Sequence, residues 1–355
     1  MPVLTQLAEV LVGEGSSALD MFTGTTRVAA GYKRSGLNVT ANDIAAYSRV
    51  LAQTYIETDA DKIDRVQLGE ILADLENTPA REGYFTETFC RRARFFQPHN
   101  GMKIDAIRDR IESEFASGPW YPILLTALME AADRVDSTTG QQMAYLKKWA
   151  ARSFKDLEMR APELIAGPGQ AVQMDANEAA RQLGHFDLVY LDPPYNQHRY
   201  FTNYHIWETL IRWDAPQAYG VAQKRVDART EETKSAYNRK REMPLALADL
   251  ISALDTDTLV LSYNNESWVT FETLYEQVAG HFADAVALGF DYKRYVGAQI
   301  GVFNPDGQRV GQAGPARNIE YVFIGGDSAA IERVRRLAQS GKLAVPGSLV
   351  DPDKY

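Results

Sequence analysis

The segment DLVYLDPPYN, residues 187–196, predicts a buried strand that ends abruptly in a rigid polar turn. Its first half is a continuous apolar run, which is typical of a strand covered on both faces of a parallel sheet. Asp192 would then lie at the carboxyl edge of that sheet, where open α/β proteins bind their ligands. Pro193 and Pro194 fix φ and remove two backbone donors, so the turn would present carbonyl oxygens outward.

Such a turn suits the recognition of an amino group on a flat ring. The Asp192 carboxylate and the Pro193 carbonyl would accept its N–H bonds, and Tyr195 would stack on the ring. Accepting these bonds turns the nitrogen lone pair towards an incoming electrophile, and catalysis is then mainly positioning and electrostatics. We therefore predict four catalytic residues: Asp192, Pro193, Pro194 and Tyr195. A plain strand-to-loop turn is the alternative, and the buried strand before it favours the catalytic interpretation.

A second candidate half-site lies near the start of the chain. The apolar run ALDMF, residues 18–22, ends in TGTT, residues 23–26; a helical pattern follows, and then a second strand-like run at residues 38–41. This order indicates the first half of a nucleotide-binding α/β fold. Gly24 would let a ligand approach the backbone, and Asp43 lies where an acid takes ribose hydroxyls. An ordinary β–α turn with a solvated acid remains an alternative on these residues alone.

A third piece is VQMDANE, residues 172–178, a short strand followed by polar residues. Asp175 would receive the amino group of a nucleoside cofactor, and capping of the next helix explains it equally well. The sequence has no GxGxxG and no GxxxxGK[ST] motif, so dinucleotide and P-loop chemistry are not supported.

The distribution of strand and helix patterns predicts an α/β protein with a Rossmann-like, doubly wound, mostly parallel sheet. Residues 69–165 are helix-biased and charged, and we expect them to form a helical insert. The predicted core therefore comprises residues 1–68 and 166–330, and residues 331–355 form a C-terminal tail.

Composition limits the classes of protein. Hydrophobic residues make up 45% and charged residues 24% of 355 residues, as in folded globular proteins. The single cysteine, Cys90, excludes an intramolecular disulfide and a multi-cysteine zinc site, and the five histidines lack metal-site spacing, so we expect no metal. We see neither a transmembrane run of about 18 apolar residues nor a signal peptide, so we expect no membrane partner and a cytoplasmic location.

The net charge of −9 argues against a general nucleic-acid coat protein, but basic residues cluster in FCRRAR, in YLKKWAAR and after the catalytic segment. Such clusters suit phosphate binding, and solvated helix faces are the alternative. Asn264 would help to hold a base or phosphate, or it forms a strand-end turn. The predicted nucleic-acid contacts are Arg91, Arg92, Lys147, Lys148, Arg199, Tyr204, Lys224, Arg225 and Asn264.

These pieces, in this order, resemble the adenine-specific DNA methyltransferases of restriction-modification systems. FTGTTRVA is similar to the family's phenylalanine–glycine cofactor motif, VQMDANE to the segment along the cofactor adenine, and DPPYN to the catalytic motif. The insert resembles the family's target-recognition region. The resemblance implies a class I methyltransferase fold and S-adenosylmethionine as cofactor. It implies these cofactor-binding residues: Phe22, Gly24, Thr25, Thr26, Asp43, Ile44, Asp175, Ala176 and Asp192.

The resemblance also implies double-stranded DNA as substrate, with the target adenine flipped out of the helix, and a cognate restriction endonuclease as partner. Thr26 stands where the family has a third-position glycine, and MPVLTQL looks like the helix that follows a Gly/Lys-containing motif of the family. We expect the chain either to start late or to have an incomplete cofactor site. Two other readings stay open: methylation of another exocyclic amine (cytosine N4 or a base in RNA), and a non-catalytic DNA-binding module.

Overall fold

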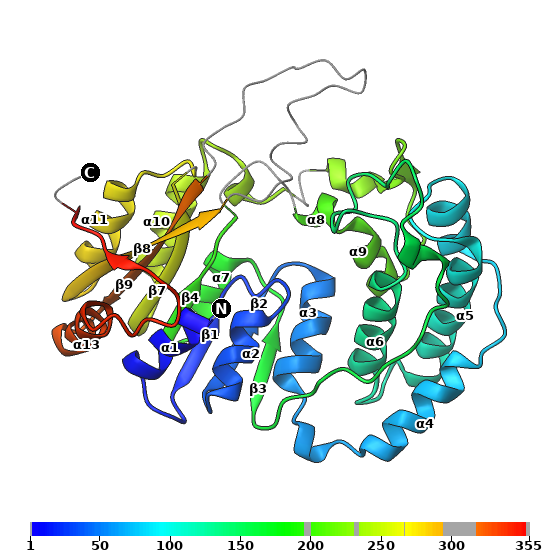
Figure 1. Ribbon diagram of the computed structural model, residues 1–355, viewed down its shortest axis with the longest axis horizontal. Coiled ribbons are helices and arrows are strands. Elements are labelled where there is room, and N and C mark those ends of the chain that lie inside the picture. Colours follow the sequence, from blue (N-terminus) through cyan, green and yellow to red (C-terminus); the bar gives the residue numbers. More distant parts are fainter. Residues whose placement is uncertain (1, 195–199, 231–233, 266, 294–316, 353–355) are drawn as a thin grey trace.

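The computed structural model describes residues 2–194, 200–230, 234–265, 267–293 and 317–352 (Figure 1). Its main sheet has eight strands in the order β10-β8-β9-β7-β4-β1-β2-β3. The strands are β1 Ser17–Asp20, β2 Asn38–Asn42, β3 Gly169–Val172, β4 Phe186–Leu191, β7 Thr256–Asn264, β8 Asp284–Lys293, β9 Arg317–Gly326 and β10 Ser348–Leu349. A separate small hairpin joins β5 Ala218–Tyr219 to β6 Lys224–Arg225.

The neighbouring strands β7, β4, β1, β2 and β3 run parallel to one another, and β9 lies antiparallel between β7 and β8. The predicted α/β fold with a mostly parallel sheet is therefore confirmed. The strand-like run that the sequence shows at residues 292–296 falls partly in β8, which begins earlier, at Asp284. Residues 294–296 lie outside the described part of the chain.

Helices cover both faces of this sheet and form a second group beside it (Figure 1). The α-helices are α1 Pro2–Leu11, α2 Arg27–Arg34, α3 Ala46–Ala52, α4 Arg65–Glu76, α5 Pro98–Phe115, α6 Tyr121–Asp133, α7 Ala176–Gln182, α8 Tyr200–Asn203, α9 His205–Arg212, α10 Met243–Ala253, α11 Phe271–His281 and α13 Ser328–Gln339. The 3-10 turns are η2 Ala60–Lys62, η4 Ala151–Phe154, η5 Val226–Arg229 and η7 Ala236–Asn238, and the π-helices are η1 Gln53–Glu57 and η3 Thr86–Arg91.

The strand β4 shows why the sheet is buried on both sides. Leu188 and Tyr190 face a cluster that includes α1, α2 and α13, whereas Val189 and Leu191 face a cluster with α7, α10 and α11. Alternate side chains of a strand point to opposite faces, so this continuous apolar run fills two cores at once. The strand is thereby fixed in the middle of the sheet, and it carries Asp192 to the carboxyl edge.

A third core lies among the helices between β2 and β3, with α9 packed against them. In Figure 1 this group stands to the right of the sheet. The basic segment YLKKWAAR has near-helical spacing of its basic residues, but residues 145–150 are not helical. Instead, Leu146 N donates to Ser137 O at 3.0 Å, which folds the segment back on the end of α6. The segment 331–355 begins inside α13, whose Ile331 and Val334 are fully buried against the sheet.

Gly101 marks a close approach between α5 and η3. A Cβ there would meet Cys90 Sγ at 2.3 Å and Thr86 Cα at 3.2 Å. We expect Gly101→Ala to lower the free energy of unfolding by about 1–3 kcal/mol, although alanine is the better helix former. Urea unfolding followed by circular dichroism measures this.

The matched control is Gly69→Ala in α4, where a Cβ would meet no atom within 4 Å. This change should raise the free energy of unfolding by up to about 1 kcal/mol, because alanine has the higher helix propensity. Equal effects of the two changes would contradict the close packing of α5 on η3.

None of the helices that the structure describes combines the length and the hydropathy that a membrane span requires.

Candidate active site

The candidate site lies where β1, β2 and β4 end side by side. The buried Asn42, the last residue of β2, ties the neighbouring strand ends together. Its Nδ2 donates to Met21 O at 3.1 Å and to Met174 O at 3.2 Å, and its Oδ1 accepts from Met174 N at 3.1 Å. The turns that follow β1 and β3 are therefore held at fixed positions around Asn42.

Asp43 fixes the glycine turn after β1. Its Oδ2 accepts from Gly24 N at 2.9 Å, and its Oδ1 accepts from Ala45 N at 2.9 Å. Burial raises the pKa of Asp43, although these two backbone bonds lower it. The acid is thus not a simple solvated side chain: it joins the turn after β1 to the turn after β2.

The turn requires left-handed backbone at two positions. Gly24 has φ +50°, which glycine adopts without a steric penalty. The buried Thr26 has φ +61° and ψ +12°, where a side chain with a β-carbon costs about 1–2 kcal/mol. The bond from Thr26 N to Thr23 O, at 2.7 Å, closes the turn and holds this conformation. The third position of the motif therefore keeps a glycine-like backbone while carrying threonine.

Asp20, the last residue of β1, is a site residue that the sequence did not reveal. Its Oδ2 accepts from Thr23 Oγ1 and from Ala29 N, each at 3.1 Å. Its Oδ1 is buried and has no hydrogen-bond partner in the described part of the chain. Burial raises the pKa of Asp20 to about 7, and the nearby carboxylates of Asp192 and Asp43 add to this rise.

Asp192 follows β4 directly and is accessible to solvent, while Pro193 behind it is buried. No residue in the described ranges donates a hydrogen bond to its carboxylate. Desolvation by the surrounding protein raises the pKa of Asp192 to about 7, and the Glu320 carboxylate of β9 raises it further. The carboxyl group is thus open on one side and enclosed by protein on the others. The predicted site residues Tyr195 and Arg199 lie outside the described residues.

The other predicted cofactor residues lie around the same edge. Asp175 caps α7, with Oδ1 accepting from Asn177 N at 2.9 Å and from Glu178 N at 3.4 Å. Capping uses one oxygen of the carboxylate, so the other is compatible with a ligand. Ala176 is buried, whereas Ile44 beside Asp43 is 57% exposed. The half-buried Phe22 contacts the Tyr237 ring edge to face, with the centroids 5.1 Å apart.

The predicted nucleic-acid residues are scattered over several elements, from η3 to the end of β7. Arg91 ends η3 and Arg92 follows it; they form exposed ion pairs with Glu82 at 2.6 Å and with Glu87 at 2.9 Å, respectively. Lys147 and Lys148 are both exposed.

Three further predicted residues are partly or fully covered. Tyr204 is half-buried, with its ring 5.7 Å from that of Tyr47. Lys224 is half-buried, and burial lowers its pKa. Asn264 ends β7 and is buried; its Oδ1 accepts from Ser267 Oγ at 2.8 Å, as in a strand-end turn.

The prediction that Arg225 contacts nucleic acid is wrong. Its side chain is 2% exposed and forms ion pairs with Asp214 at 2.6 Å and Asp227 at 2.7 Å. Asp227 lies only two residues further along the chain, whereas Asp214 lies eleven residues earlier, before the hairpin. Arg225 therefore stabilises the hairpin β5–β6 and has no free donor face for a phosphate.

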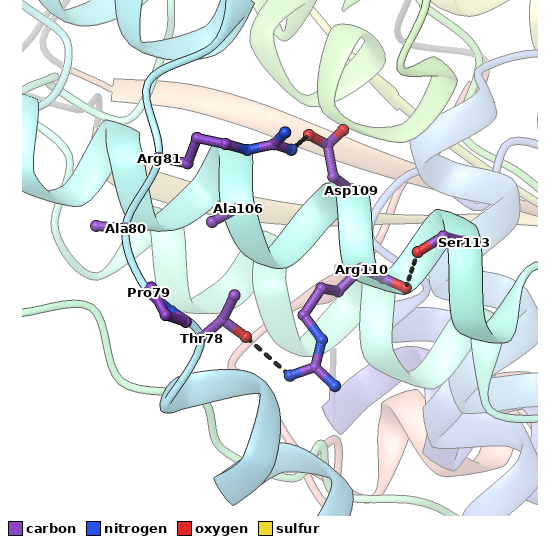
Figure 2. Close-up of a pocket in the computed structure, with 8 residues that line it drawn as sticks. All are labelled: Thr78, Pro79, Ala80, Arg81, Ala106, Asp109, Arg110 and Ser113. Carbon is purple, nitrogen blue, oxygen red and sulfur yellow. Dashed lines mark hydrogen bonds and ion pairs between the residues drawn. The ribbon is translucent and has the colours of Figure 1, made fainter.

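Two other features lie away from this edge. A hollow of about 440 Å³ beside α5 is lined by Arg81 and Arg110, and Arg81 pairs there with Asp109 (Figure 2). Arg110 pairs with Asp74 and Glu114. Their charges are neutralised within the protein, so the hollow does not attract anions.

The second feature is a cluster of His185, Asp187 and Asp257 at the amino edge of the sheet, whose ligand atoms lie within 4.8 Å of one another. Asp187 Oδ2 already accepts from Ser17 N and Oγ, at 2.6 and 2.7 Å, so this carboxylate serves the start of β1.

Comparison with known proteins identifies relatives of this chain. A family model for D12 class N6 adenine-specific DNA methyltransferases matches residues 2–277. Modification methylase StsI of Streptococcus sanguinis is 32% identical over 271 residues, which is 72% of this chain and 41% of StsI. Type II methyltransferase M.NlaIII of Neisseria lactamica is 31% identical over 286 residues, which is 78% of this chain and 83% of M.NlaIII.

A third relative, type II methyltransferase M.FokI of Planomicrobium okeanokoites, is 29% identical over 282 residues, covering 74% of this chain and 42% of M.FokI. The chain therefore matches less than half the length of StsI and M.FokI, but most of M.NlaIII. The family model spans the glycine turn, the helices between β2 and β3, and the Asp-Pro-Pro turn. On this match the chain belongs to the D12 class of N6 adenine-specific DNA methyltransferases.

Proposed function

We propose that this chain transfers the methyl group of S-adenosylmethionine to N6 of a flipped-out adenine in double-stranded DNA, as the modification enzyme of a restriction-modification system. The observation that carries the proposal is the position of Asp192. This exposed residue directly follows β4, and its carboxylate lies near that of Asp20, at the end of β1 before the glycine turn. An acceptor for the target amine and a candidate cofactor site thus share one sheet edge. A cognate endonuclease and a cytoplasmic location belong to the same proposal.

The residues at this edge fit the cofactor. The buried Asp20 Oδ1, which has no partner among the described residues, suits a cationic donor such as the methionine ammonium group, directly or through a water molecule. Asp43 and Asp175 would meet the ribose hydroxyls and the adenine amino group, with Phe22 and Ile44 against the adenine faces. The cofactor supplies an electrophilic methyl group. Asp192 and the Pro193 carbonyl would hold the target amine, and Tyr195 would stack on the flipped base.

The proposed DNA-binding face includes the loop that carries Lys147 and Lys148. Gln142 fastens this loop to the helices after the catalytic turn: its N donates to Asn203 O, and its Oε1 accepts from Ile206 N, each at 2.8 Å. Arg94 Nη1 donates to Lys147 O at 3.1 Å, and Arg94 Cζ lies 4.8 Å from the centroid of the Trp149 ring.

The two lysines thus project from a fixed loop attached to α8 and α9. This placement supports phosphate contacts that set the register of the duplex at the catalytic turn.

The test is methylation of DNA of mixed sequence with labelled S-adenosylmethionine, followed by digestion to nucleosides and mass spectrometry. N6-methyladenine in DNA is the expected product. N4-methylcytosine, or labelled RNA in a parallel reaction, would redirect the proposal to another amine. Absence of cofactor binding in a calorimetric titration would refute the catalytic role.

We expect the double change Lys147→Ala and Lys148→Ala to weaken DNA binding and to make it less dependent on salt. Each phosphate contact contributes about 0.9 to the slope of log K against log salt, so loss of both should reduce the slope by about 2. Fluorescence anisotropy with a labelled duplex at several salt concentrations measures the slope. Lys342→Ala is the control, since this exposed residue follows α13 on the far side of the sheet. An unchanged slope in the double variant would exclude the loop from the DNA-binding face.

A further inference from the structure

We propose that Tyr237 is a positioning residue for the cofactor, connecting the glycine turn after β1 to the start of α7. The inference rests on the proposed function, because it assigns a role within the same cofactor site. Tyr237 lies in η7, more than forty residues after Asp192, and it is only 2% exposed. It therefore has no direct access to solvent and acts through the groups that it contacts.

The ring and the hydroxyl of Tyr237 contact two different segments of the proposed cofactor site. Its ring meets the half-buried Phe22 edge to face, with the centroids 5.1 Å apart and the planes at 75°. Its hydroxyl donates to Asn177 Oδ1 at 2.8 Å. Asn177 in turn donates from its backbone N to Asp175 Oδ1 at 2.9 Å. One side chain thus reaches from the turn after β1 to the cap of α7.

The orientation of the Asn177 amide is fixed by its other partners. Its Nδ2 donates to Ala246 O at 2.9 Å and to Asp249 Oδ2 at 2.6 Å, and both of these atoms are acceptors. Oδ1 must therefore face Tyr237 and accept, so the Tyr237 hydroxyl is the donor. The amide is held by α10 on one side and by Tyr237 on the other.

This bridge spans two strand ends that are not neighbours in the sheet, and it adds to the link that Asn42 makes between Met21 and Met174. Phe22 follows β1 and Asp175 precedes α7 after β3, with β2 between the two strands. A nucleoside bound across this edge needs both segments at a fixed separation. A buried bridge that sets the separation in advance reduces the ordering cost of binding. Its effect should therefore appear in cofactor affinity and not in the rate of methyl transfer once cofactor is bound.

The test is Tyr237→Phe, which keeps the ring against Phe22 and removes the bond to Asn177, together with the longer contact of the same hydroxyl with Ala246 O at 3.4 Å. We expect the dissociation constant for S-adenosylhomocysteine to rise about five-fold, the loss typical of one neutral hydrogen bond. The KM for S-adenosylmethionine should rise by a similar factor, whereas kcat at saturating cofactor should change less than about two-fold.

Tyr275→Phe is the matched control. It removes a hydroxyl that donates to Ala285 O at 3.2 Å, between α11 and β8, and should leave cofactor affinity unchanged. Urea unfolding of both variants checks that each is folded.

A second variant, Asn177→Ala, removes the acceptor of the same bond. The double variant Tyr237→Phe with Asn177→Ala should bind cofactor no more weakly than Asn177→Ala alone, because the shared bond is lost only once. Wild-type cofactor affinity in Tyr237→Phe, or a fall in kcat with unchanged KM, would overturn the inference about Tyr237 but not the proposed function. Failure of the wild-type chain to bind cofactor would overturn the proposed function and the inference with it.

Discussion

Replacement of Asp192 by alanine is expected to abolish methyl transfer while leaving the chain folded. The carboxylate is accessible to solvent, and no residue in the described ranges donates a hydrogen bond to it. Its removal therefore leaves no buried donor unpaired in that part of the protein. It also relieves the repulsion that Asp192 exerts on Asp20 and that Glu320 exerts on Asp192. The free energy of unfolding should stay the same or rise slightly.

The effect on catalysis follows from the proposed role of the carboxylate as acceptor for the target amine. Removing one preorganised polar group from a reacting centre typically lowers kcat by about 10²–10³-fold. A label-transfer assay at saturating DNA and cofactor measures this loss. Titration with S-adenosylhomocysteine distinguishes a catalytic defect from failure to bind the cofactor.

Asp257→Ala is the matched control for this experiment. It removes the same group from an exposed position near the start of β7, at the opposite edge of the sheet. We expect this variant to retain wild-type activity. An Asp192→Ala enzyme with more than about a tenth of the wild-type kcat would rule out the acceptor role, given the loss expected for such a group.

The strands that build the site were predictable because their signal is local. The continuous apolar run of β4 and the polar residues after β1 and β2 determine both burial and placement at one edge. Asp43 and Asp192 follow from this pattern alone.

The residues that hold these turns in place were not predictable in the same way. Asn42 forms a hydrogen bond to Met174, which is 132 residues away in sequence, and Tyr237 forms one to Asn177, which is 60 residues away. Sequence spacing carries no information about such contacts. For Arg225 the nearby Asp227 is visible in the sequence, but the burial of the guanidinium and its second partner Asp214, eleven residues earlier, follow only from the fold.

Glu208 in α9 is the clearest example of such a long-range contact. Its side chain is fully buried, and it accepts from Ala46 N at 3.1 Å and Tyr47 N at 3.4 Å, the first amides of α3. It also accepts from Arg212 Nε at 2.6 Å. A carboxylate at a helix amino end satisfies free N–H groups and complements the helix dipole. Glu208 therefore attaches the helix after the catalytic turn to the segment that begins at Asp43.

We expect Glu208→Ala to lower the free energy of unfolding by about 3–5 kcal/mol, because it leaves Arg212 and the start of α3 without their buried partner. Urea unfolding measures the change as a shift of the midpoint at constant slope. The control is Glu332→Ala in α13, which removes an exposed pair with Arg336 at 2.9 Å and should cost less than about 1 kcal/mol. Equal losses in the two variants would show that the contacts of Glu208 stabilise the fold no more than an exposed ion pair does. A larger loss for Glu208, together with weaker binding of S-adenosylhomocysteine, would show that the helix after the catalytic turn supports the cofactor site.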